Sequence, residues 1–329
     1  MISPRTIRNL RCELSGSLLA KLGVALVAII FLTAIFAPVL APHDPTNQDL
    51  DNSHVPPVGF ATTETQTSSE FVDGEVQIVE EEVEVETTFD HVLGTDSLGR
   101  DVLSRTMFGA RTSLLVGVLG TSMAVVLGVT VGVTAGYYGG RVDDALMRFS
   151  DVMLAFPSLV LAIALIGLWG QAAFRFPDPL VALGIASAEM PENVVLPGTV
   201  IVVVALVNWV WFARVARGEA MSVRDEEYVK AARSMGGGDL HVIRKHVLPN
   251  SLTPILVLAT IQIAAVILLE SALSFLGFSG AQLSWGFDIA QGREYLSSSW
   301  WIATVPGLAI VAAVIGINLI GDWLRDALD

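Results

Sequence analysis

Six apolar runs, each close to the length that crosses a lipid bilayer, decide what this chain can fold into. They lie near residues 22–41, 113–136, 152–170, 198–213, 254–275 and 302–321. A helix rises 1.5 Å per residue, so about 20 apolar residues cross the roughly 30 Å of hydrocarbon. A soluble domain has shorter apolar stripes broken by charge, whereas only 16% of these residues are charged. The sequence therefore predicts an all-α polytopic membrane protein with six transmembrane helices.

The positively charged residues predict how these helices are oriented. Lys and Arg accumulate in the cytoplasmic loops of membrane proteins. With the N-terminus inside, 14 of the 19 Lys and Arg residues lie on cytoplasmic segments and five lie outside. The first apolar run follows four of these cations, but it is long for the core of a signal peptide, so we interpret it as an uncleaved anchor. Both termini are predicted to be cytoplasmic.

These predictions divide the chain into five parts. They are a cytoplasmic tail at 1–21, the first transmembrane helix at 22–41, an extracytoplasmic segment at 42–111, a five-helix core at 112–323 with a cytoplasmic loop at 214–253, and a cytoplasmic tail at 324–329.

The extracytoplasmic segment carries most of the acidic charge of the chain. Residues 42–111 contain 15 Asp or Glu residues and three Arg residues, within a net charge of −14 for the whole chain. This field repels polyanions, which excludes nucleic acid as a partner. The composition suggests a salt-adapted surface and a halophile. Residues 44–90 form an acidic insert for which two interpretations stay open: a hairpin turning at Asp73-Gly74, or a disordered segment.

Polar and small residues inside the apolar runs mark two further features. Glu270 is the ionisable residue within these runs, and such a group must find a partner or water. It either lines the translocation path or an outer gate, or hydrogen-bonds a neighbouring helix. Gly128, Gly132 and Gly136 form a stripe that predicts close packing against another helix, in this chain or in a partner subunit. Pro157 predicts a kink.

The sequence offers no pattern for covalent chemistry. None of its three lysines is followed by Ser or Thr, as a P-loop requires, so ATP hydrolysis is expected from a separate subunit. Cys12 is the only cysteine, and the five histidines lie outside the apolar runs without metal-ligand spacing. We therefore expect no enzyme activity, no cofactor and no metal.

The cytoplasmic loop is longer than a simple channel requires. Residues 226–235 favour a helix, which Gly236-Gly237-Gly238 ends. Asp239 is expected to cap a second helix at 240–247, before Pro249. A helix, a turn and a helix held between two membrane spans form a lever that a soluble partner can push, although a solvated hairpin on the lipid headgroups has the same periodicity.

The residues of this loop resemble a known family. Ala231-Ala232, Gly236 and His246-Val247-Leu248-Pro249 have the spacing of the EAA loop of permease subunits in binding-protein-dependent ABC importers, with Lys230 and His246 departing from its usual residues. In that family the loop forms the helix that docks on the ATPase subunit. The resemblance implies a coupling role for a set of seven residues: Tyr228, Ala231, Ala232, Gly236, Asp239, Leu248 and Pro249.

Further blocks resemble the C-type permeases of the dipeptide, oligopeptide and nickel group. They lie at 94–105, 135–140, 151–157, 273–277 and 321–329. The resemblance implies a type I importer permease fold in a prokaryotic plasma membrane. The implied partners are two ABC ATPase subunits, a B-type permease paralogue and an extracytoplasmic solute-binding protein. Peptides are the expected cargo, with nickel or another solute as the alternative.

Two other classes of function compete with this interpretation. A secondary transporter or channel would use intramembrane carboxylates, broken helices and repeated halves, but the apolar runs hold one carboxylate and no convincing repeat. A receptor or scaffold would not need the long cytoplasmic loop.

Overall fold

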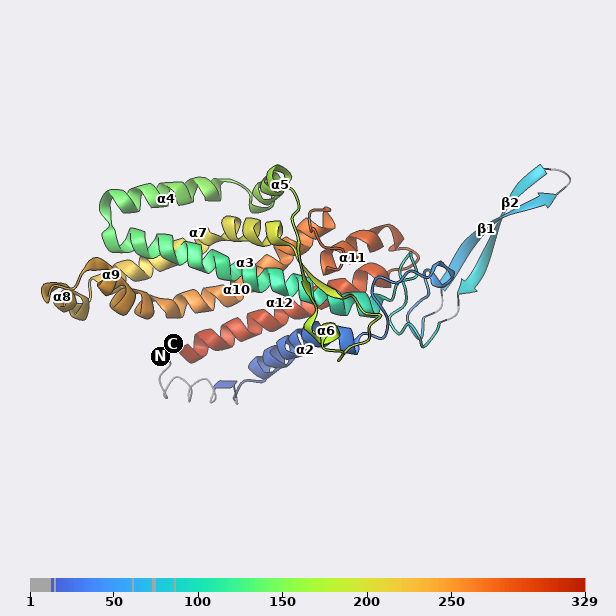
Figure 1. Cartoon of the computed structure of the whole chain (residues 1–329), viewed down its shortest axis with the longest axis horizontal. Helices are drawn as coiled ribbons and strands as arrows, with labels where there is room; N and C mark the ends of the chain where they lie inside the picture. Colours follow the sequence, from blue (N-terminus) through green and yellow to red (C-terminus); the bar gives the residue numbers. More distant parts are fainter. Residues whose placement is uncertain (1–12, 15, 61, 73–74, 86, 329) are drawn as a thin grey trace.

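The chain forms a long bundle of helices with a β-hairpin at one end (Figure 1). The computed structural model describes residues 13–14, 16–60, 62–72, 75–85 and 87–328. Within these ranges the main helices are α2 (Leu18–Leu40), α3 (Val102–Tyr138), α4 (Gly140–Ala155), α5 (Ser158–Trp169), α7 (Gly198–Arg224), α10 (Leu248–Phe275) and α12 (Trp301–Leu328). Shorter helices are α6 (Pro179–Ala182), α8 (Glu227–Ser234), α9 (Asp239–Val242) and α11 (Trp285–Gly292). The strands are β1 (Thr62–Val72), β2 (Glu75–Val85), β3 (Phe174–Pro177) and β4 (Asn193–Leu196).

Five of the six predicted spans fall on single helices, and the sixth, at 152–170, covers the end of α4 and all of α5. Among the described residues, five helices are long and apolar enough to cross a membrane, and α4 with α5 makes a sixth span if the bent pair counts as one. The kink predicted at Pro157 is a complete break, because α4 and α5 meet at 92°. Proline lacks the N–H that would continue the ladder, and Phe156 before it has the extended backbone that proline favours.

The glycine stripe of α3 packs against α7 of the same chain. A Cβ on Gly128, Gly132 or Gly136 would lie 2.2 to 2.5 Å from a backbone carbonyl oxygen of α7. Only glycine allows the two backbones to approach so closely, and close packing holds helices together in lipid. The predicted stripe is therefore an interface within this chain, and it brings the ends of α3 and α7 together beside α8 and α9.

The anchor helix α2 lies along α12. A Cβ on Gly23 would meet the Cβ of Leu319 at 2.6 Å, and one on Gly316 would meet Val27 at 3.0 Å. Ala34 joins residues of α3, α10 and α12 in one of the buried apolar clusters. Many large apolar side chains of α2 remain exposed, as expected for a helix that faces lipid.

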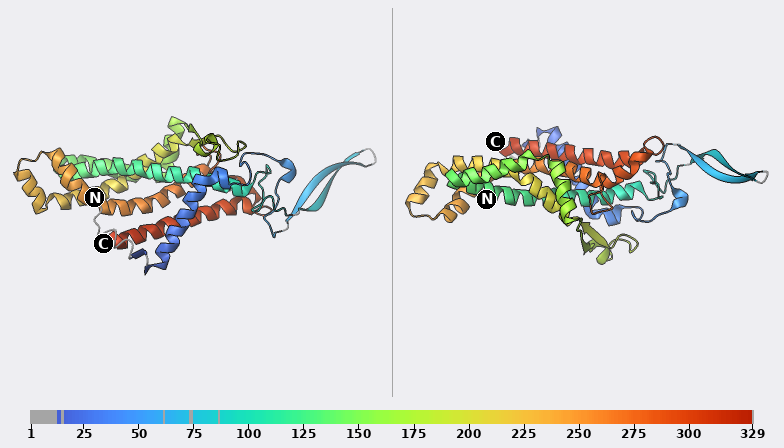
Figure 2. Two further views of the ribbon diagram at one scale, coloured as in Figure 1. Left: turned by 60° about the horizontal axis from the view of Figure 1, so that its bottom comes forward. Right: turned by 90° about the horizontal axis from the view of Figure 1, so that it is seen from above.

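The acidic insert contains a hairpin rather than only irregular chain. β1 and β2 pair antiparallel from Thr62↔Val85 to Val72↔Glu75. The turn was predicted at Asp73-Gly74, two residues that lie outside the described ranges. The hairpin projects beyond the bundle, at the end opposite α8 and α9 (Figures 1 and 2).

The loops at the hairpin end are held by buried ion pairs around the start of α3. Arg105 bonds the Asp288 carboxylate of α11 and donates to the carbonyl of Pro45 at 3.0 Å. Arg100 donates to Asp96 at 2.7 Å. Asp101 caps α3 by accepting from the N–H of Ser104 at 2.7 Å. The segment from residue 94 to 105 is thus ordered, as the sequence predicts, and α3 begins at Val102, eleven residues before the apolar run.

Candidate functional site

The loop predicted to be cytoplasmic forms a helical hairpin at the far end of the bundle, where α8 and α9 meet (Figure 1). Gly236 follows α8 with φ of +85°, which confirms the left-handed turn expected of a residue that ends a helix. Its N–H donates to the carbonyl of Arg233, and the N–H of Gly237 donates to that of Ala232. This pair of bonds is the Schellman motif, which satisfies the last carbonyls of the helix.

The second half of the loop differs from the sequence prediction. Gly238, not Asp239, is the N-cap of α9, and Asp239 is the first residue within the helix. Nor does the helix end before Pro249. It continues from α9 through a π-helical turn at Ile243–Val247 into α10, so Asp239–Phe275 is one continuous helical segment. Pro249 comes just after this π-helical turn, where the hydrogen-bond pattern already departs from that of an α-helix. The second half of the predicted lever is therefore a direct extension of α10.

The hairpin has a buried face and an exposed apolar tip. Val229 and Ala232 belong to the apolar cluster shared with α3, α7 and α10. Ala231 points outward, so the two alanines of the motif lie in different environments. Tyr228, Met235 and Leu240 are 44%, 83% and 66% exposed. Such side chains, gathered on a small hairpin, form a surface suited to contact with another protein.

A contact that the sequence analysis missed fastens the hairpin to α3. The hydroxyl of Tyr137 donates to Asp239 Oδ1 at 2.8 Å. The guanidinium of Arg233 lies 4.5 Å from the centre of the Tyr137 ring, within the range of a cation–π interaction. Tyr137 belongs to the block at 135–140 that carries part of the family resemblance, but nothing in the sequence pairs it with residue 239.

Arginines of α7 brace the same end of the bundle. Arg224 donates to the carbonyl oxygens of Gly136 and Tyr137 at 3.0 and 3.2 Å, which satisfies the end of α3. Arg217 forms a two-pronged ion pair with Asp143 of α4, with one bond at 2.6 Å. α3, α4 and α7 are thereby joined where the hairpin leaves the bundle.

Glu270 lies on α10 far from the hairpin and is 1% exposed. Its carboxylate accepts hydrogen bonds from Ser113 Oγ of α3 at 2.8 Å and from Ser274 Oγ at 2.6 Å. The two hydroxyl donors offset part of the free-energy cost of burying this carboxylate. The bond from Ser113 also joins α3 to α10. Of the two roles expected for Glu270, this geometry favours a helix-to-helix contact.

No group of three close potential metal ligands lies among the described residues of the helical hairpin. Among the described residues, the one group of at least three close potential ligands is His43, His91 and Asp101, at the opposite end of the bundle.

Comparisons with known proteins agree on one family. Residues 128–329 match the family described as "Binding-protein-dependent transport system inner membrane component", and residues 14–57 match the "N-terminal TM domain of oligopeptide transport permease C". The probable D,D-dipeptide transport system permease protein DdpC of Escherichia coli K12 is 34% identical over 318 residues, covering 96% of this chain and 89% of the relative. The dipeptide transport system permease protein DppC of Alkalihalophilus pseudofirmus is 34% identical over 320 residues, covering 96% and 87%. Among solved structures, the MetNI methionine ABC transporter aligns with a TM-score of 0.51 at 17% identity, over 69% of this chain and 96% of that one, which concerns the fold alone.

Proposed function

The chain belongs to the inner membrane permeases of binding-protein-dependent transport systems, and we propose that its cargo is a di- or oligopeptide. It has the fold of a type I ABC importer permease and serves as a transmembrane subunit of such an importer. The observation that carries the peptide proposal is the 34% identity, over nearly the whole chain, to permeases named for dipeptide transport. The match of residues 14–57 to the oligopeptide permease C domain agrees with it.

The proposed importer has four kinds of partner for this chain. They are two ABC ATPase subunits, a B-type permease paralogue, an extracytoplasmic solute-binding protein and the lipid bilayer. ATP is hydrolysed by the ATPase subunits, because Lys21, Lys230 and Lys245 have no P-loop around them. ATP-driven closure of those subunits moves both permeases between inward and outward states around a central path.

The helical hairpin at the cytoplasmic end is the proposed contact with the ATPase subunit. Its exposed apolar tip offers Tyr228, Met235 and Leu240 to a cleft, and Ala231 allows a close approach. Gly236 sets the direction of the turn, and Ala232 packs inward to hold α8 in place. Leu248 and Pro249 begin α10, so they pass movement of the hairpin directly to a membrane helix.

Orientation follows from the same proposal. The hairpin end is cytoplasmic, as are both termini, and the β-hairpin end is extracytoplasmic. A background with Cys12→Ser allows single cysteines to be placed at Gln48 and Ser222, which lie exposed at the two ends. A membrane-impermeant thiol reagent added to right-side-out vesicles should label Gln48→Cys alone. Labelling of both from one side would overturn the orientation.

The acidic insert is proposed to adapt the extracytoplasmic surface to high salt, as in a halophile. Deleting residues 60–86 should leave assembly with the second permease intact and shift the salt optimum of transport more than its maximum rate. Loss of assembly at optimal salt would show instead that the insert holds the complex together.

The proposed function is tested by the cargo itself. The importer is assembled from this chain and the ATPase, second permease and binding protein of the same organism that co-purify with it, and the ligands that the binding protein retains are identified by mass spectrometry. Retained peptides, together with ATP-dependent uptake of labelled peptide into proteoliposomes, are expected. A retained metal ion or sugar, with no peptide uptake, would replace the peptide proposal while leaving the permease role intact. Uptake driven by an ion gradient without ATPase subunits would favour the secondary transporter.

A further inference from the structure

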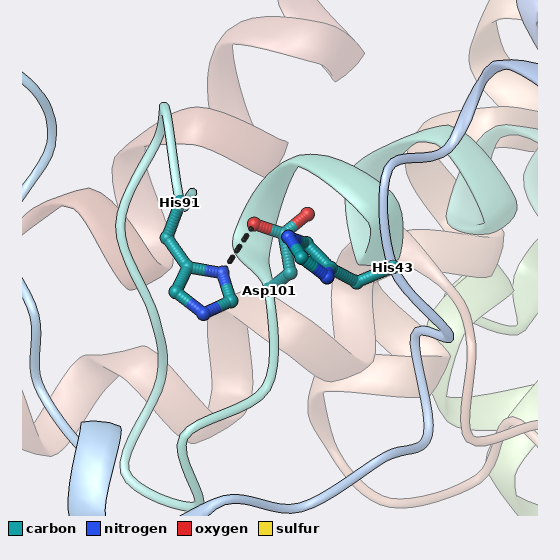
Figure 3. A group of neighbouring side chains, drawn as sticks. All are labelled: His43, His91 and Asp101. Carbon is teal, nitrogen blue, oxygen red and sulfur yellow. Dashed lines mark hydrogen bonds and ion pairs between the residues drawn. The ribbon is translucent and has the colours of Figure 1, made fainter. Parts of the chain in front are cut away.

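Three potential metal ligands from separate segments meet at the extracytoplasmic end of the bundle (Figure 3). His43 follows α2, His91 follows the β-hairpin, and Asp101 is the residue before α3. Each offers one ligand atom, and the three atoms lie within 4.8 Å of one another. The rings of His43 and His91 have centroids 4.6 Å apart, and His91 Nδ1 lies 3.1 Å from Asp101 Oδ1.

Neighbouring groups already hold His43 and Asp101 in the form that binds a metal. His43 Nε2 lies 2.8 Å from the carbonyl oxygen of Asp90, which can only accept, so this nitrogen carries the proton and Nδ1 keeps its lone pair. Asp101 Oδ2 accepts from both the N–H and the hydroxyl of Ser104 at 2.7 Å. A histidine that donates to a carbonyl and a carboxylate that is hydrogen-bonded through its second oxygen form the outer shell typical of metal sites.

We propose that His43, His91 and Asp101 bind one divalent transition metal ion of the zinc type. Two imidazoles and one carboxylate suit Zn²⁺, whereas Ca²⁺ and Mg²⁺ prefer sites made of oxygen ligands. On binding, the hydrogen bond between His91 Nδ1 and Asp101 Oδ1 is broken, the imidazole proton moves to Nε2, and both freed atoms bind the ion. Water supplies the fourth ligand. The carboxylate offsets one of the two positive charges of the ion.

An open hollow gives the ion access to the site, and the acidic residues around it attract cations. His43 lines an open, mostly polar hollow of about 670 Å³ between the end of α2 and residues 185–190. The segment at 42–111 has 15 acidic residues and three arginines, a charge balance that raises the local concentration of cations. His91 is partly exposed, at 12% of its side chain, so the site can be reached without unfolding.

The proposed ion closes the base of the acidic insert. His43 and Asp90 are 47 positions apart in the chain, and the whole β-hairpin lies between them. A metal that joins His43, His91 and Asp101 ties both ends of this insert to the first turn of α3. Closing a long loop removes many conformations from the unfolded chain, so binding should stabilise the extracytoplasmic end. No chemistry on the cargo is implied.

The test uses the full chain purified in detergent with a histidine-free tag and stripped by a chelator. Titration calorimetry with Zn²⁺ alone should find one ion per chain, and Co²⁺ should give the visible absorption of a four-coordinate site. Asp101→Asn and His91→Gln should each weaken Zn²⁺ binding about tenfold or more. Asparagine is also a good helix N-cap, so Asp101→Asn is expected to fold even where His91→Gln does not.

Two controls separate this site from other histidines. His54→Gln changes a histidine in the same extracytoplasmic region that hydrogen-bonds Ser299 instead, and should bind Zn²⁺ as the unchanged chain does. His241→Gln with His246→Gln removes the imidazole pair of the cytoplasmic end, whose ring centroids are 6.2 Å apart. The proposal is overturned if no ion binds stoichiometrically, if binding survives Asp101→Asn unchanged, or if it is lost in either control.

Discussion

The hydroxyl of Tyr137, at the end of α3, donates a 2.8 Å hydrogen bond to Asp239, the first residue of α9. A membrane helix is thereby joined directly to the hairpin that is the proposed contact with the ATPase. Arg233 from α8 lies over the same tyrosine ring at 4.5 Å, so both arms of the hairpin touch one side chain. Since the hairpin also continues into α10, movement at its tip can reach α3 and α10 together.

Replacing Tyr137 with Phe tests this connection. The change keeps the ring beneath Arg233 and removes one hydrogen bond, which is worth about 0.5–1.5 kcal/mol. We expect normal membrane levels but weaker stimulation of ATPase activity by the loaded binding protein in proteoliposomes. Tyr138→Phe, at a neighbouring tyrosine that is 52% exposed, is the matched control and should keep full stimulation. Equal stimulation in both variants would mean that the bond between Tyr137 and Asp239 does not contribute to coupling between the permease and the ATPase.

The sequence predicted the spans and the glycine turn because both depend on neighbouring residues. Apolar run length locates the start of α2, α7 and α12 to within about four residues, whereas α7 and α12 continue past the ends of their runs to Arg224 and Leu328. Gly236 alone indicates a left-handed turn. The Asp239 cap was wrong because Gly238 has the extended backbone of an N-cap and Asp239 is already helical. The Asp239 carboxylate instead accepts from the Tyr137 hydroxyl, 102 positions away, a contact that local pattern cannot show.

Other features depended on the packing of distant segments. Pro157 indicated a kink, but its 92° size depends on where α4 and α5 pack. The histidines were treated as isolated because metal-ligand spacing was sought along the chain, whereas His43, His91 and Asp101 meet only once the insert folds back. The glycine stripe predicted a helix interface, but its partner, α7, became known only from the fold.

The two alanines of the loop should respond differently to the same substitution. Ala231→Glu places a charge on the exposed face, so the chain should insert and keep its Tm, while the desolvation of an unpaired charge weakens docking and uptake. Ala232 is 8% exposed in the apolar cluster, so Ala232→Glu should lower the Tm and the membrane level. Thermal unfolding in detergent and ATP-dependent uptake check both. Full uptake by Ala231→Glu would exclude this face as the ATPase contact.

Gly236 and Gly238 provide a matched pair for the turn. Gly236 has φ of +85°, which a β-branched residue resists, whereas Gly238 has the ordinary extended φ of −68° and open space around its Cβ position. Gly236→Val should change the direction of the chain after α8. The variant should reach normal membrane levels but lose stimulated ATPase activity and uptake. Gly238→Val should retain most of both. Similar loss in the two variants would point to side-chain bulk rather than to backbone direction.

The packing of α3 on α7 predicts a stability difference between two glycines of this helix pair. A Cβ on Gly132 would lie 2.2 Å from the carbonyl oxygen of Ala213, so Gly132→Ala must push the helices apart at a cost of about 1–3 kcal/mol. Gly218 of α7 has open space, and Gly218→Ala should leave the Tm unchanged or raise it. The Tm of the isolated chain in detergent is the measurement. An unchanged Tm for Gly132→Ala would mean that the two helices do not pack this closely.

Glu270 allows its two possible roles to be separated. Its carboxylate accepts from Ser113 and Ser274. Glu270→Gln keeps the size and a hydrogen-bond acceptor, so a helix-to-helix contact should survive with near-normal uptake. Glu270→Leu removes the acceptor for both buried hydroxyls, which should cost about 1–3 kcal/mol and lower the Tm. If the contact is structural, Ser113→Ala should recover part of the Tm lost in Glu270→Leu, because one orphaned hydroxyl is then gone. If instead Glu270→Gln abolishes uptake at an unchanged Tm, the charge itself is required, and Glu270 belongs to the translocation path or its outer gate.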